Sequence, residues 1–236
     1  AGRTEMKYIL QQLRYQLKVF LRDKTHWVMP VLSLVLLVTN VGYKDKNILS
    51  IIYINYNASH IFLYLSIVYG AMCTRFFLLE VNEDHQIQWS RPLTRQGFVL
   101  VKYLSSLIGI ATFLLPSLIL LVLRGVPFNN TANLLHGIGH WFYLFVPTFS
   151  FVTAFSILVG LVIPKMALAV GVTLVGLAGA GMRTVSWPDM LKYVPYRSYS
   201  LVFGFGPERE VMQFNRVFFI AVSAMILFLT IILAHW

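Results

Sequence analysis

Residues 89–95 read Trp89-Ser90-Arg91-Pro92-Leu93-Thr94-Arg95, and this polar, basic stretch separates two long apolar segments. The apolar segments, Ser59–Leu79 and Leu104–Leu123, each have roughly the 20 residues that a helix needs to cross the hydrocarbon core of a bilayer. Of the 236 residues in the chain, 58% are hydrophobic and 12% are charged, and the mean hydropathy is +0.71. The hydrophobic fraction and the hydropathy are above those of an ordinary soluble domain and the charged fraction is below, so the sequence predicts an integral membrane protein.

Six segments of the chain are apolar enough to form membrane-spanning helices, which satisfy every backbone hydrogen bond without water. The sequence therefore predicts an all-α integral membrane protein in which residues 25–236 form a six-helix transmembrane domain. The fifth segment is short and rich in small residues, so it is either a tightly packed span or a re-entrant piece. Apolar residues 47–56 either lengthen the second helix or lie at the outer interface. The expected spans are Trp27–Tyr43, Ser59–Leu79, Leu104–Leu123, Trp141–Ile163, Met166–Met182 and Val217–His235.

Residues 1–24 have the pattern of an amphipathic helix. At the helical spacing of about 100° per residue, apolar side chains that include Leu17 and Phe20 fall on one face. A separate stripe is basic and consists of Lys7, Arg14, Lys18 and Arg22. Such a helix is expected to lie flat at the cytoplasmic membrane surface, with its basic side chains toward anionic lipid headgroups. The alternative is an amphipathic helix that packs on a partner protein.

The distribution of positive charge predicts which helix ends face the cytoplasm. Of the 19 Lys and Arg residues, 11 fall on the amino-terminal side of the expected spans and eight on the opposite side. Because Lys and Arg are enriched in cytoplasmic segments, both termini are expected in the cytoplasm. The single cysteine, Cys73, falls within the second span, so no disulfide within one chain is expected.

The connection between the second and third spans, residues 80–97, carries charges of both signs. The acids Glu80, Glu83 and Asp84 open it, and acids stabilise the positive end of a helix dipole. Pro92 would end or redirect a short helix at this point. A rigid segment with both signs of charge fits a socket on another protein. The alternative is a solvated loop whose basic residues only follow the charge asymmetry of membrane proteins.

Three features follow one another in a characteristic order. They are a basic amphipathic helix, a Leu21-Arg22-Asp23-Lys24 lead into the first span, and a cytoplasmic Arg91-Pro92-Leu93-Thr94-Arg95 segment with Phe98 and Lys102 downstream. This order resembles the permease subunits of type-2 ATP-binding-cassette exporters. The resemblance covers nearly the whole chain, including six spans and a long final outer connection. The chain departs from a Gly-Thr pair that the family often has after the acids, since residues 84–88 read Asp-His-Gln-Ile-Gln.

The resemblance implies that a separate polypeptide supplies the energy. In the family, two permeases and two ATPases assemble, and a cytoplasmic coupling helix transmits ATPase closure to the spans. This implies a second permease, identical or homologous, two ATPase copies that bind ATP and Mg²⁺, and no nucleic-acid partner. No G-x-x-x-x-G-K-[ST] phosphate-binding sequence occurs here, so we expect this chain to hold no cofactor or metal and to be no enzyme. The resemblance assigns the ATPase contact to Glu83, Asp84, Trp89, Arg91, Pro92 and Arg95.

These observations predict a permease subunit of an exporter in a bacterial cell membrane. The expected interior is apolar with scattered hydroxyl groups, which disfavours small inorganic ions and favours an amphipathic or hydrophobic substrate such as a peptide, a drug or a lipid-like compound. The alternative from a different class is a non-transporting immunity or scaffold subunit. An ion-driven carrier is disfavoured, because all nine acids fall outside the expected spans or at their ends.

Other residues have two interpretations each. His136 and His140 have the i, i+4 spacing of metal ligands on a helix, but no Glu of an H-E-x-x-H motif accompanies them, which favours an interface position. The small residues Gly171, Gly176 and Ala180 indicate close helix packing, either within the chain or at a seam between two permeases. The aromatic connection at residues 183–216 is either an outer re-entrant element, by resemblance, or a belt of residues at the outer interface.

Overall fold

The computed structural model of the protein describes residues 2–39, 50–83, 94–125, 131–181, 193 and 208–234. Nearly all of these residues are helical, and no strand occurs among them. The prediction of an all-helical fold is therefore confirmed for this part of the chain. The elements are α1 (Gly2–Arg22), the 3-10 helix η1 (Lys24–Trp27), α2 (Val28–Thr39), α3 (Ser50–Glu83), α5 (Arg95–Gly125), α6 (Thr131–Val162), α7 (Met166–Gly181) and α8 (Glu208–Leu233).

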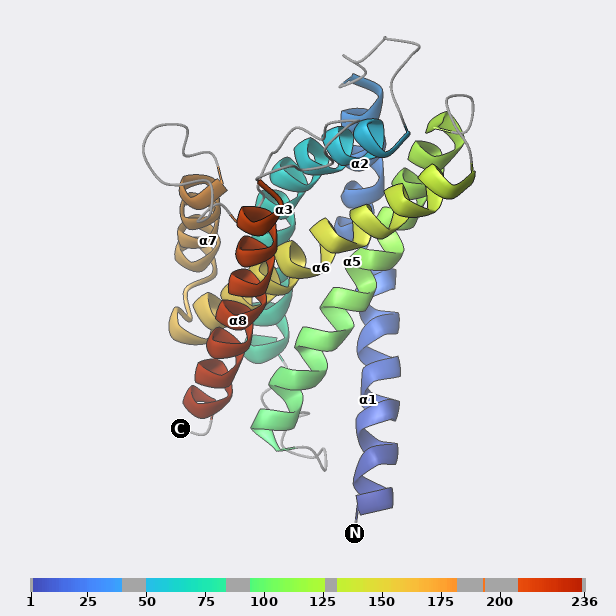
Figure 1. The fold of residues 1–236 in the computed structure, drawn as a ribbon. Helices are drawn as coiled ribbons and strands as arrows, with labels where there is room; N and C mark the ends of the chain where they lie inside the picture. The colour runs from blue at the N-terminus through green and yellow to red at the C-terminus, as the bar shows by residue number, and fades with distance from the viewer. Residues whose placement is uncertain are drawn as a thin grey trace.

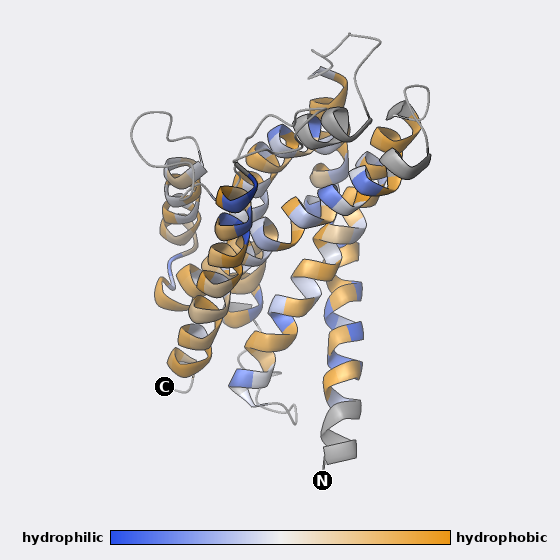
Figure 2. Cartoon of the chain, in the orientation of Figure 1, coloured by the Kyte–Doolittle hydropathy of each residue, from blue (hydrophilic) through white to orange (hydrophobic). Residues whose placement is uncertain are grey.

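Four helices contain segments that are long and apolar enough to cross a membrane. Two shorter apolar helices, Lys24–Thr39 and Met166–Gly181, coincide with the expected first and fifth spans. In Figure 2 hydrophobic residues predominate along α5, α7 and α8, whereas hydrophilic and hydrophobic residues alternate along α1. The described residues are thus compatible with a membrane protein. The four long segments are Asn57–Val81, Gln96–Leu123, Leu135–Val162 and Arg209–Leu233.

Helix α6 is at the centre of the molecule and packs against α3, α5, α7 and α8. Helix α1 packs mainly against α5, and α2 continues from α1 past the short η1 segment. The start of α1 and the end of α8 lie toward the same end of the molecule (Figure 1). The helices in between run alternately away from that end and back toward it.

The contact of α3 with α6 is built from aromatic rings. The ring centroid of Phe62 lies 5.2 Å from that of Trp141 and 5.4 Å from that of Phe149. On another face of α3, a Cβ atom added at Gly70 would lie 2.2 Å from Leu177 Cδ1 of α7. A Cβ atom there would displace the Leu177 side chain, so glycine allows the close approach of α3 and α7.

The starts of α3 and α8 bear on two expectations from the sequence. Helix α3 begins at Ser50, so the apolar residues from there to Tyr56 lengthen the second helix. Helix α8, which contains the expected last span, begins at Glu208 and therefore starts before Val217. The connection at residues 183–216 is shorter by the same residues. The helix continues through Asn215 and Arg216 because both side chains are buried inside the bundle, where protein groups replace water.

Candidate functional site

The structure places the two ends of the predicted coupling segment. Glu83 is the last residue of α3, and Arg95 is the first residue of α5. The ends of residues 80–97 are therefore extensions of the two long helices. The expectation that Glu80 and Glu83 lie at the amino-terminal end of a helix is wrong, because α3 continues through them and ends at Glu83. Four of the predicted contact residues, Asp84, Trp89, Arg91 and Pro92, lie outside the described residues. Their contact with an ATPase stays a prediction.

A buried ion pair joins α3 to α5 close to this segment. The Nζ atom of Lys102 lies 2.6 Å from Oε2 of Glu80, and the side chain of Lys102 is only 1% exposed. The same Nζ atom lies 3.6 Å from the ring centroid of Phe76, where the negative face of the ring attracts a cation. Because Glu80 is near the end of α3 and Lys102 is near the start of α5, the pair fixes the spacing of the two helices that flank residues 84–93.

Helix α1 joins the same pair. Nε2 of the fully buried Gln16 donates a hydrogen bond of 3.1 Å to Oε2 of Glu80. Four residues further along α1, the ring of Phe20 occupies a notch at Gly109 of α5, where a Cβ atom would lie 2.3 Å from Phe20 Cδ1. Together, Gln16, Glu80 and Lys102 form a polar junction of α1, α3 and α5.

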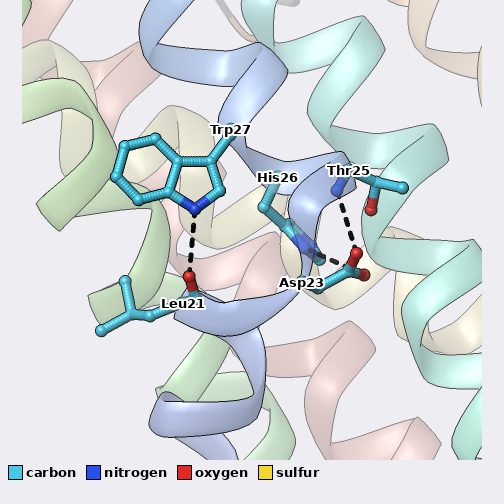
Figure 3. Close-up of polar contacts among 5 residues, drawn as sticks. All are labelled: Leu21, Asp23, Thr25, His26 and Trp27. Atoms are coloured by element: carbon cyan, nitrogen blue, oxygen red, sulfur yellow. Dashed lines mark hydrogen bonds and ion pairs between the residues drawn. The ribbon is translucent and has the colours of Figure 1, made fainter.

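The turn between α1 and α2 is held by polar contacts among its own residues (Figure 3). The backbone N–H of Thr25 donates to Oδ1 of Asp23 at 2.9 Å, and Oδ2 of Asp23 lies 3.3 Å from Nδ1 of His26. The indole N–H of Trp27 donates to the backbone carbonyl of Leu21 at 3.2 Å. The His26 ring packs 3.9 Å from the ring of Phe20, so the turn and the end of α1 form one unit.

The Asp23 carboxylate caps η1. Burial acts to raise the pKa of Asp23, but the hydrogen bonds from Thr25 and the positive fields of His26 and Arg75 outweigh burial. The pKa of Asp23 therefore lies below its ordinary value of 3.8. A carboxyl group with a lowered pKa stabilises the folded state above that ordinary value, and this contribution is lost as the pH falls through the folded-state pKa.

Changing Asp23 to Ala is expected to lower the free energy of unfolding by about 1 kcal/mol, because the N-cap acceptor is lost. Asp23→Asn should cost less, since an amide oxygen still accepts from Thr25. Urea unfolding of the purified protein in detergent, measured at pH 7 and near pH 3, tests both. The difference in stability between the parent protein and the Asp23→Ala variant should shrink at the lower pH, and an unchanged difference would contradict the assignment.

The four basic residues that were predicted to face the membrane surface all lie on α1. Arg14, Lys18 and Arg22 are exposed, and Lys7 lies in α1 with a side chain outside the described part of the structure. The apolar face is not uniform. Phe20 is buried against α5, whereas Leu10 is 57% exposed. The carboxyl-terminal half of α1 thus packs within the chain, and its earlier part presents an apolar surface.

The predicted packing residues of α7 have different surroundings. A Cβ atom at Gly176 would lie 3.1 Å from Phe155 Cζ of α6, and Ala180 packs against the main hydrophobic core. A Cβ atom at Gly171 would meet no atom within 4 Å. Close intrachain contact therefore occurs at Gly176 and Ala180, and Gly171 faces open space in the single chain.

His136 and His140 lie on α6, where His136 is exposed and the ring of His140 is 5.4 Å from that of Tyr143. The described residues contain no group of three His, Cys, Asp or Glu side chains placed to hold a metal ion.

Sequence reasoning missed how the polar junction is assembled. The sequence places Glu80 at the start of the connection and Lys102 downstream of residues 91–95, but no pattern paired them or connected either to Gln16. The signal in the sequence that could have predicted the ion pair is the opposite charge of Glu80 and Lys102, which lie near the two ends of one short connection. The comparisons add no further assignment, because no family model, curated protein or solved structure matches the chain.

Proposed function

We propose that the protein is the permease subunit of a type-2 ATP-binding-cassette exporter that moves an amphipathic or hydrophobic substrate. The observation that carries the proposal is the polar junction. A charged segment, residues 84–93, connects two apolar helices, and the buried Glu80–Lys102 pair holds those helices together next to it. Force applied to such a segment would move α3 and α5 as one body.

The proposal includes six spans, with α2 and α7 as the short first and fifth spans. Two observations support it. Both helices are apolar and coincide with expected spans, and the start of α1 and the end of α8 lie toward the same end of the molecule (Figure 1). In this topology both termini are cytoplasmic, as the charge asymmetry of the sequence favours. Helix α1 then presents the exposed Arg14 and Lys18, on either side of Gln16 in the polar junction, near the cytoplasmic headgroups.

In this proposal the energy comes from a separate ATPase with ATP and Mg²⁺, and residues 1–236 contain no phosphate-binding loop of the Walker type that would bind the nucleotide here. Residues Glu83 to Arg95 form the ATPase contact, and the substrate passes between two permeases, identical or homologous. The buried junction supports this arrangement mechanically. A coupling segment on loosely joined helices would lose its displacement in local motion, whereas helices joined by a buried ion pair and a third helix transmit it.

Reversing the charge of both Arg91 and Arg95 to Glu is expected to abolish stable co-purification with the ATPase or to lower its permease-stimulated rate by roughly tenfold or more, since like charges replace opposite ones at a contact. The measurement is affinity purification of the complex followed by its ATPase rate in lipid nanodiscs. Lys165→Glu is the matched control, because Lys165 is an exposed cation in the connection between α6 and α7. Assembly and turnover that survive the double reversal would contradict the contact and favour a non-transporting scaffold.

A further inference from the structure

Arg216 is a buried cation inside an apolar helix. It lies within the apolar segment Arg209–Leu233 of α8, and its side chain is 2% exposed. The guanidinium donates through Nε to Oδ1 of Asn215 at 2.9 Å and through Nη1 to Oγ1 of Thr148 at 3.2 Å. It also reaches the backbone carbonyl of Leu144 at 3.5 Å. A charged side chain inside an apolar segment is costly unless other groups compensate its charge.

Among the described residues, the partners of Arg216 are neutral. The ion pairs of the described residues involve Asp23 and Glu80, and Arg216 takes part in neither. Within this part of the chain its charge is compensated by carbonyl, amide and hydroxyl oxygens alone. Hydrogen bonds to neutral oxygens can be exchanged for water without separating two opposite charges, so this arrangement releases more easily than a buried ion pair.

One of these oxygens belongs to Tyr193, which is fully buried. The backbone carbonyl of Tyr193 accepts from Nη2 of Arg216 at 3.0 Å and from Oγ1 of Thr148 at 3.1 Å. The hydroxyl of Tyr193 lies 3.0 Å from Oγ of Ser66 in α3. A Cβ atom at Gly181 would lie 2.9 Å from this hydroxyl. The glycine at the end of α7 therefore allows the close approach of the Tyr193 ring. Tyr193 therefore touches α3, α6, α7 and α8.

We propose that Arg216 and Tyr193 form a releasable latch that joins α3, α6 and α8. The latch is in the half of α8 nearer Glu208, away from the end where both termini lie (Figure 1). Its role in transport rests on the proposed function, in which that end is the outer one, and separation of α8 from α6 there lets the substrate leave. The polar junction at Glu80 and the latch at Arg216 then hold opposite ends of the bundle.

Protection of the Tyr193–Val194 bond from chymotrypsin tests the latch. In the protein purified in detergent, Arg216→Met is expected to raise the cleavage rate of this bond by about tenfold or more, because hydrogen bonds from a charged donor are lost and cleavage follows the population of the open form. Mass spectrometry identifies the cleaved bond. Cleavage after Phe149, in the buried part of α6, reports global unfolding and should not rise in parallel.

Tyr193→Phe is the matched control, since it keeps both the cleavage site and the carbonyl that Arg216 binds and removes only the contact with Ser66. It should raise the rate much less than Arg216→Met does. Arg216→Lys keeps the charge but not the geometry of the guanidinium group, so it should also raise the cleavage rate. If Arg216→Met does not fold, the cleavage rate of Arg216→Lys tests the latch instead. Parent-like cleavage in the folded Arg216 variants, or cleavage that rises equally after Phe149, would overturn the latch. No ATPase is needed, so this result is independent of the charge-reversal test at Arg91 and Arg95.

Discussion

Replacing Lys102 with Met is expected to lower the free energy of unfolding by about 3 kcal/mol or more, one of the two largest effects that we predict for a single substitution. The substitution removes the cation that lies 2.6 Å from Oε2 of Glu80, and the carboxylate stays in a site that is only 14% exposed. Breaking a buried ion pair on one side is strongly destabilising, because the remaining charge has lost its counterion in an interior of low polarity. Urea or thermal unfolding of the purified protein in detergent measures the change.

The double variant Glu80→Met with Lys102→Met separates the ion pair from simple packing. It should recover most of the stability, since two apolar side chains of similar length replace two charges and leave none uncompensated. Lys165→Met, at an exposed position, should change stability little. A double variant that is as unstable as Lys102→Met would show that the methylene chain of Lys102, and not its charge, matters at the junction.

Phe20→Ala is expected to lower the free energy of unfolding by about 3 to 5 kcal/mol, because it empties a fully buried aromatic site between α1 and α5. The ring also contacts Phe76 of α3, with ring centroids 5.5 Å apart and the rings edge to face. Its loss therefore loosens all three helices of the polar junction. The same unfolding measurement detects the effect.

The matched control for Phe20→Ala is Leu10→Ala on the same helix. Leu10 is 57% exposed in the single chain, so its truncation should leave the unfolding free energy nearly unchanged. If the two variants were equally stable, α1 would not be docked on α5 through Phe20. If Leu10→Ala instead weakened binding to anionic vesicles, this would support the proposed placement of α1 at the membrane surface.

Most of the helical fold was predictable from the sequence, because apolar periodicity and length are local properties. The amphipathic pattern of residues 1–24 predicted the helix observed at Gly2–Arg22, and the apolar stretches predicted the long helices α3, α5 and α6. The start of α8 was not predictable in the same way. Arg216 and the acids near Glu208 look like loop residues in a hydropathy profile, and only the acceptors around the buried Arg216 explain how the helix contains it.

The candidate site shows a similar division. Sequence reasoning identified the connection between α3 and α5 as the segment that carries charge, and the ends of these helices enclose residues 84–93. It did not pair Glu80 with Lys102, because the partner of a charge on another helix depends on the rotation of both helices. Gln16 was still less visible, since it is an ordinary polar residue in an amphipathic helix until α1 lies against α5.

The sequence by itself determined that the chain is helical, that its helices are apolar enough for a membrane, and that the basic residues of α1 form a stripe. These properties follow from side-chain hydrophobicity at a fixed helical spacing and need no knowledge of neighbours. Only the tertiary structure decided which polar groups share a buried site, namely Gln16 with Glu80 and Lys102, and Tyr193 with Arg216. A buried polar group must find its partner within a few ångströms, and residues so far apart in sequence come that close only when the helices pack.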